Sequence, residues 1–294
     1  MPQTLICAID DSDRAYEAVS VACDLAQRLD LPLMLAHVVE EPLGYPFGES
    51  EEMESERRQR LARGTELLHH VATTLDLPSD VEMRTESGEP SAMLQTLAEE
   101  ERAALLVVAS RGRGRIRSAL FGSVSGHLID GLPCPMLVVT PGAATRYRAG
   151  HELPDAAVVC GIDGATAVEQ LVPLAAKMAD RLHARLLLVH AELPAMSTSH
   201  GIPSSAGASI AGAPLVLHDR VDEHQEAARR QLERAEQLAT TSRVEARVEL
   251  GEIGTTMATL AEDTSVQLLA VAQNSSWQLI ASRAGCPVLV VPAS

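Results

Sequence analysis

The chain has 294 residues, of which 46% are hydrophobic and 22% charged, a composition typical of a globular protein with about two domains. Its formal net charge of −16 argues against sequence-independent binding to nucleic acid, which needs a basic surface. No apolar run reaches the roughly 20 residues of a membrane span, and the N-terminus shows no secretory signal. We therefore expect a cytoplasmic protein without nucleic-acid or membrane partners.

Strand and helix patterns alternate through the first half of the chain. Apolar runs predict strands at residues 3–9, 33–39, 81–85, 104–109 and 134–139. Helical spacing of apolar residues predicts helices at 13–29, 51–75 and 89–101, the first with Ser12 as its N-cap, and a short helix between 122 and 131. Continuous Val, Leu and Ile runs are typical of parallel strands buried on both faces. The alternation predicts a doubly wound α/β sheet.

The second half repeats the first. "LICAIDDSD" at 5–13 matches "VVCGIDGAT" at 158–166, and "CPMLVV" at 134–139 matches "CPVLVV" at 286–291. We therefore predict two tandem doubly wound Rossmann-like domains, 1–142 and 155–294, each with a five-stranded parallel sheet flanked by helices. The Pro-, Gly- and Ala-rich segment 141–155 is the expected linker. The role of the loop at 192–214, as a lid or as a plain connection, is left open.

A polar stretch rich in Gly, Ser and Arg follows the strand at 104–109. Gly112 and Gly114 allow the backbone to approach a ligand closely, and Gly122-Ser123 stands at an expected helix start, which favours an anion. Asp10 ends the first strand, beside the same crevice of a doubly wound sheet. These residues predict a nucleotide site. A flexible turn with a helix cap, and a helix-capping role for Asp10, remain as alternatives.

This site cannot be a P-loop. The chain has a single lysine, Lys177, inside an apolar helical pattern, whereas a Walker-A loop needs a lysine that reaches the phosphates.

The sequence resembles the universal stress protein family in "AIDDSD", "AHVVE" and "GSVSGHLIDGLPCPMLVV". ATP-binding members of that family carry G-x-x-G, nine residues, then G-[ST]. Here Gly112 is followed by nine residues and Gly122-Ser123, while Ala109 replaces the first glycine. The resemblance implies ATP, with or without Mg²⁺, as the ligand.

The resemblance also assigns individual residues. The phosphates would be held by Gly112, Gly122, Ser123 and Ser125. The site beside them would be lined by Ala109, Arg111 and Val124. The nucleoside would be contacted by Asp10 and Val38, with Ala8 nearby.

The second half lacks the Gly-rich segment. Between Ala109 and Cys134 lie 24 residues, but only 13 lie between the matching Ala272 and Cys286. We therefore predict one nucleotide site, in the first half. Asp163, which matches Asp10, is then interpreted as a turn or helix-start residue.

We expect a nucleotide-binding stress or regulatory protein whose output is its conformation or its choice of an unidentified protein partner. A ligand-free interaction module and a cyclic-nucleotide binder are the alternatives. No catalytic residue and no metal site is predicted, so any ATP hydrolysis or self-phosphorylation would be weak. His37 and His190 are interpreted as structural, and the five cysteines as reduced, mostly buried thiols.

By the family resemblance, the strands at 134–139 and 286–291 would face each other within one chain and form a dimer-like monomer. Whether two chains pair further into a homodimer is left open.

Overall fold

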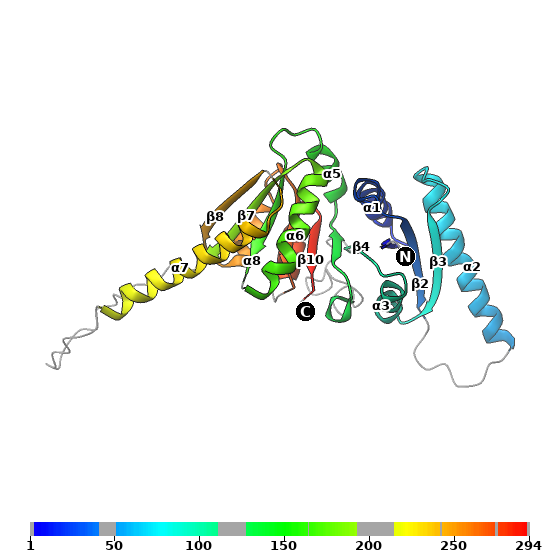
Figure 1. Ribbon diagram of the computed structural model, residues 1–294. Coiled ribbons are helices and arrows are strands. Elements are labelled where there is room, and N and C mark those ends of the chain that lie inside the picture. Colours follow the sequence, from blue (N-terminus) through cyan, green and yellow to red (C-terminus); the bar gives the residue numbers. More distant parts are fainter. Residues whose placement is uncertain are drawn as a thin grey trace, which may run out of the picture.

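The computed structural model describes residues 3–40, 51–110, 128–163, 165–192, 215–241, 243–273 and 276–292. It contains one ten-stranded sheet flanked by helices (Figure 1), with the strand order β3-β2-β1-β4-β5-β10-β9-β6-β7-β8. Each half contributes five strands in the order 3-2-1-4-5, and neighbours within a half pair in parallel. The prediction of two doubly wound units is confirmed, and the units share one sheet.

The elements have the following bounds. The strands of the first half are β1 Leu5–Ala8, β2 Leu33–Glu40, β3 Glu82–Gly88, β4 Leu105–Ala109 and β5 Met136–Val139. Those of the second half are β6 Ala157–Ile162, β7 Arg185–Glu192, β8 Val244–Leu250, β9 Val266–Ala272 and β10 Val288–Val291. The α-helices are α1 Ala15–Leu29, α2 Glu51–Thr74, α3 Pro90–Glu100, α5 Ala143–Gly150, α6 Ala165–Leu182, α7 Leu215–Leu238, α8 Ile253–Leu260 and α9 Trp277–Arg283. Of the predicted short helix between 122 and 131, the described part is Leu128, which is α-helical, and a 3-10 turn, Ile129–Gly131.

The start of α1 differs from the prediction. The helix begins at Ala15, and Arg14 stands at the N-cap position without a side-chain hydrogen bond. The hydroxyl of Ser12 instead donates to Asp10 Oδ1 at 2.5 Å. Because that hydroxyl is engaged in the turn that precedes the helix, it does not cap α1.

The two halves meet through their last strands. β5 and β10 pair antiparallel, with Leu137 opposite Leu289 in the centre of the ladder, and both side chains are fully buried. Beside the sheet, Arg28 and Arg181, which are 153 residues apart, each donate to the other's backbone carbonyl, at 3.4 Å and 3.0 Å. These reciprocal contacts indicate a pseudo-two-fold axis that relates the two halves. The expected pairing of the two last strands within one chain is confirmed.

The segment expected as a linker contains a packed helix, α5. Tyr147 in this helix is fully buried, and its hydroxyl donates to Asp24 Oδ2 at 2.7 Å. Gly150 lies against β9 so closely that a Cβ there would stand 2.7 Å from Gln267 Cγ. The small residues that suggested an interdomain linker therefore permit a helix to pack between the two halves.

Each face of the sheet has a hydrophobic core that runs through both halves. One core includes Leu25 of α1 and Leu186 of β7, and the other includes Leu94 of α3 and Met257 of α8. Among the helices that the structure describes, none combines the length and apolarity needed to cross a bilayer.

Candidate functional site

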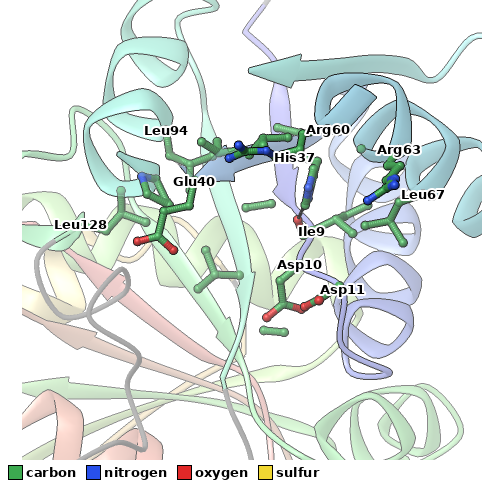
Figure 2. A pocket seen from close by; sticks show the side chains of 18 residues that line it. Ile9, Asp10, Asp11, His37, Glu40, Arg60, Arg63, Leu67, Leu94 and Leu128 are labelled. Carbon is green, nitrogen blue, oxygen red and sulfur yellow. Dashed lines mark hydrogen bonds between the residues drawn. The ribbon is translucent and has the colours of Figure 1, made fainter. Parts of the chain in front are cut away.

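A cavity of about 610 Å³ opens at the carboxyl ends of β1, β2 and β4 (Figure 2). In a doubly wound sheet this is where ligands bind, because the strand order reverses between β1 and β4 and leaves a crevice there. Four residues predicted for the site line the cavity from three different strands: Ala8, Asp10, Val38 and Ala109. The predicted residues that the structure describes are thus brought together.

The other predicted residues lie outside the described part of the chain. They are Arg111, Gly112, Gly122, Ser123, Val124 and Ser125.

One side of the cavity is apolar. Ala8 and Val38 pack against the core beneath α3, and Leu94 of α3 and Leu128 line the same side. These side chains present hydrocarbon surface with few polar groups to satisfy, as pockets for planar ring systems commonly do.

Asp10 stands at the end of β1 and holds a turn. Its Oδ1 accepts from the backbone N–H of Ser12 at 3.2 Å and from the Ser12 hydroxyl. Since Arg14 is at the N-cap position of α1, the helix-capping role considered for Asp10 is not what the structure contains. Oδ2 has no partner among the residues described around it, so one oxygen of this cavity-lining carboxylate is available to accept a hydrogen bond.

The opposite side of the cavity is formed by α2 and is polar. Arg60, Arg63, Gly64 and Leu67 line it from one face of the helix. The arginines and Gly64 were not predicted as site residues. The spacing i, i+3, i+4, i+7 within the charged helix 51–75 was the signal that could have found them, but only the tertiary structure orients this face toward the cavity.

The ring of His37, a residue of β2, lies against α2 and has a structural role. Its Nδ1 donates to the carbonyl of Ile9 at 2.8 Å, and a Cβ on Gly64 would stand 2.7 Å from its ring. In the second half, His190 makes the same contact with the carbonyl of Ile162 at 3.0 Å. Because the contact recurs in the half that lacks the Gly-rich segment, it belongs to the fold.

In the second half, the residues that correspond to Ala8 and Leu94 on the apolar side of the cavity pack closely against each other. Gly161 takes the place of Ala8, and Met257 takes the place of Leu94. Met257 is fully buried, and a Cβ on Gly161 would stand 2.9 Å from its Cε. The buried Trp277 belongs to the same core. The two halves therefore share a backbone plan but differ in the side chains at these positions.

The shortened connection after β9 is fastened to α8. Glu252, at the N-cap of α8, accepts from the N–H groups of Gly254 and Thr255 at 2.9 Å and 2.8 Å. The hydroxyl of Ser276 also donates to Glu252, at 3.2 Å. These hydrogen bonds hold the carboxylate ionised and lower its pKa. The Glu252 carboxylate thus satisfies two backbone N–H groups at the N-terminus of α8.

Comparison with known proteins gives a consistent set of relatives. The model of the universal stress protein family matches residues 1–140. A universal stress protein of Thermus aquaticus is 31% identical over 142 residues, which are 47% of this chain and 99% of that protein. The crystal structure of a universal stress protein from Archaeoglobus fulgidus aligns with 99% of this chain and 96% of its own, at a TM-score of 0.64 and 13% identity.

A shorter universal stress protein from Archaeoglobus fulgidus has been solved in complex with dAMP. It aligns with 47% of this chain and 96% of its own at 20% identity and a TM-score of 0.30. Its ligand is a property of that protein.

Proposed function

The chain belongs to the universal stress protein family, and from that premise we propose that its first half binds an adenine nucleotide, with ATP as the ligand. One observation supports this proposal above the others. The cavity at the carboxyl ends of β1, β2 and β4 joins Ala8, Asp10, Val38 and Ala109, which the family resemblance assigns to the nucleoside and to the site beside the phosphates. Its volume of about 610 Å³ is within the range of small-molecule sites.

The proposal divides the ligand between two sets of residues. The base and ribose lie against the apolar side of the cavity, with Asp10 Oδ2 as an acceptor for a ribose hydroxyl. The phosphates are assigned to the Gly-rich segment, through Gly112, Gly122, Ser123 and Ser125, with Arg111 and Val124 beside them. No group of three or more His, Cys, Asp or Glu side chains suited to a metal occurs in the described ranges. In this proposal, any Mg²⁺ is assigned to the phosphates of ATP.

The proposal assigns no nucleotide to the second half. Only 13 residues separate Ala272 from Cys286, whereas 24 separate Ala109 from Cys134, so the second half has no counterpart of the Gly-rich segment. We propose that residues 1–142 act as the nucleotide-binding unit and residues 155–294 as a partner unit that shares the sheet. The readout is then a change in conformation or in binding to a protein partner. All five cysteines are free, which supports a reducing, cytoplasmic location.

The test is to identify the nucleotide released on denaturation and to measure thermal unfolding with added ATP. A ligand at 100 times its Kd stabilises the native state by about 2.7 kcal/mol, so a clear rise in melting temperature is expected. Val38→Glu, which places a charge against the base, should abolish the rise. The matched control is Ala191→Glu, at the corresponding position of β7, and it should leave the rise intact.

A second variant addresses the phosphates: Gly122→Asp should also abolish the effect of ATP. A protein that releases no nucleotide and shows no shift with ATP would instead support a ligand-free interaction module. A shift with a cyclic nucleotide and none with ATP would assign the same cavity to that ligand.

A further inference from the structure

The sheet ends at a strand whose outer side has no neighbouring strand in the described part of the chain. β8 is the last strand at one end of the sheet (Figure 1), and it pairs in parallel with β7. The pairing runs from Val244 to Leu250 without a shift of register, and the strand contains no proline. Bulges and prolines commonly keep an edge strand from pairing with another chain. β8 has neither of these features.

The backbone of β8 presents hydrogen-bonding groups on this outer side. The carbonyl of Arg243 accepts from the N–H of Leu186 in β7, so the odd-numbered residues of β8 face β7. Backbone groups of successive residues point to opposite sides of a strand. Those of Val244, Ala246 and Val248 therefore point away from the sheet. An added strand would pair with β8 through these residues.

One face of this edge is apolar and exposed. Val248 and Leu250 are 43% and 76% exposed. β3 is the strand at the opposite end of the sheet, and its corresponding residues are Thr85 and Ser87, which are polar. The correspondence is set by the structural histidines, because Thr85 lies opposite His37 and Val248 lies in the same position in the other half. Pairing with a further strand would remove part of the apolar surface of β8 from water, which favours association.

The other face of β8 carries charges of alternating sign. Arg243, Glu245, Arg247 and Glu249 stand at every second position. Glu245 pairs with Arg185 at 2.6 Å, and its side chain is 54% exposed. Arg247 Nε lies 3.0 Å from Glu249 Oε1, with side chains 41% and 36% exposed. Ion pairs at such exposed positions contribute little, so these groups can take another partner at small cost.

This order of charges is complementary to itself when two copies of β8 run antiparallel. If Ala246 lies opposite Ala246 of a second copy, Glu245 of each copy faces Arg247 of the other. In the same register, Arg243 faces Glu249. Opposite charges directly across an antiparallel pair stabilise it, whereas like charges destabilise it. A two-fold axis at Glu245 or at Arg247 would oppose like charges, so the order favours an axis at Ala246.

The backbone permits the same register. Ala246 lies opposite its own copy and Val244 lies opposite Val248, and all of these residues direct their N–H and C=O groups outward. They can therefore form the hydrogen-bonded pairs of an antiparallel ladder. The charged residues then fall at the non-hydrogen-bonded pairs, where Cα atoms are about 4.5 Å apart and side chains lie closest. Charge order and backbone direction thus agree on one register.

The strand at the opposite edge lacks this complementarity. β3 has Glu82, Arg84 and Glu86 at the matching positions, but Asp80 precedes them where β8 is preceded by an arginine. In the equivalent register, Asp80 would face Glu86 of the second copy. Arg84 is also engaged within the chain, by Glu86 at 3.0 Å and by Glu101 at 3.4 Å. The self-complementary edge therefore belongs to the second half.

We propose that β8 is a self-association edge, through which two copies of the chain pair antiparallel about Ala246 and join their sheets. The occupant is a second copy of this chain because the charge order of β8 matches itself. The inference goes beyond nucleotide binding and does not depend on it, since the cavity lies in the first half.

The experiment is sedimentation velocity of the full chain over a range of concentrations. The unaltered protein should show a concentration-dependent equilibrium between monomer and dimer. Glu245→Arg and Arg247→Glu should each weaken dimerisation about tenfold, because each makes both symmetry-related pairs repulsive. The double variant, Glu245→Arg with Arg247→Glu, exchanges the charges and should restore the dimer. The two single substitutions change the net charge in opposite directions, so a shared effect cannot come from overall charge.

A second measurement needs no substitution. In amide hydrogen exchange followed by NMR, the outward N–H groups of Ala246 and Val248 should exchange more slowly at high protein concentration than at low concentration. The N–H of Gly251 donates to the carbonyl of Glu192 at 2.8 Å within the chain, so its exchange should be independent of concentration.

The matched control is Arg84→Glu at the corresponding position of β3, and it should leave dimerisation unchanged. A protein that stays monomeric at every concentration would refute the proposal. A dimer that neither single variant weakens would place the interface elsewhere, and failure of the double variant to restore it would exclude the register. An equal loss in Arg84→Glu would assign the contact to β3. Each of these results overturns the proposal.

Discussion

Replacement of Gly64 by alanine tests the close approach of α2 to the sheet. An added Cβ would lie 2.7 Å from His37 Cδ2 and 2.8 Å from Thr85 Cγ2, both well inside van der Waals contact. Neither neighbour can withdraw freely, because His37 Nδ1 is hydrogen-bonded to the carbonyl of Ile9 and the Thr85 hydroxyl lies 3.1 Å from that of Thr65. Overpacking of this kind costs about 1–3 kcal/mol.

A competing effect has the opposite sign. Alanine is more favourable than glycine within a helix by about 1 kcal/mol. The difference predicts a decrease of about 1 kcal/mol in the free energy of unfolding for Gly64→Ala, measured by urea denaturation. Ala228→Gly, at the corresponding position of α7, serves as the control. There the Cβ is already accommodated, so the variant should lose the helix-propensity contribution of about 1 kcal/mol.

A double-mutant cycle with His37→Ala identifies the contact. If the imidazole ring is the obstacle, Gly64→Ala should cost less in the His37→Ala background, with a coupling energy above about 0.5 kcal/mol. An increase in stability of about 1 kcal/mol for Gly64→Ala alone would mean that the helix gains its full propensity without a clash. That result would refute the close approach, and with it the defined position of the cavity-facing arginines.

Two further predictions concern titration and thiol chemistry. Burial, and to a smaller extent the charge of Arg28, lower the pKa of His151. As the pH decreases, the unfolded chain therefore takes up a proton on His151 before the folded protein does, and the unfolding free energy should fall through about pH 6.5. His151→Gln should flatten this pH dependence. An unchanged slope in the variant would contradict a lowered pKa of His151. With a thiol reagent, Cys23 alone should react in the native protein, and slowly, because it is half-buried and its pKa is raised. All five thiols should react in denaturant. Fast labelling of a second cysteine in the native protein would contradict the burial of the other four, Cys7, Cys134, Cys160 and Cys286.

Much of the fold follows from the sequence because its elements are specified locally. Runs such as "ALLVVA" before Ser110 can be satisfied only by strands covered on both faces, and their alternation with helical patterns leads to a doubly wound sheet. The repeat carries this interpretation into the second half. Parallel strands with one reversal of order place their carboxyl ends at one crevice, so the sequence groups Asp10 with the stretch that follows β4. Val38 and Ala109 were assigned to the site by the family resemblance.

The features that only the tertiary structure decided depend on contacts between distant segments. The packing of helix α5, within the segment predicted as a linker, depends on the contact of Gly150 with Gln267. The close packing of Met257 of α8 against Gly161 of β6 is likewise a contact between distant segments. Arg60 and Arg63 look like part of a solvated helix face until α2 is docked at Gly64. Local pattern predicts which face of an element is apolar, whereas the neighbour that each face meets is determined by packing across the whole sheet.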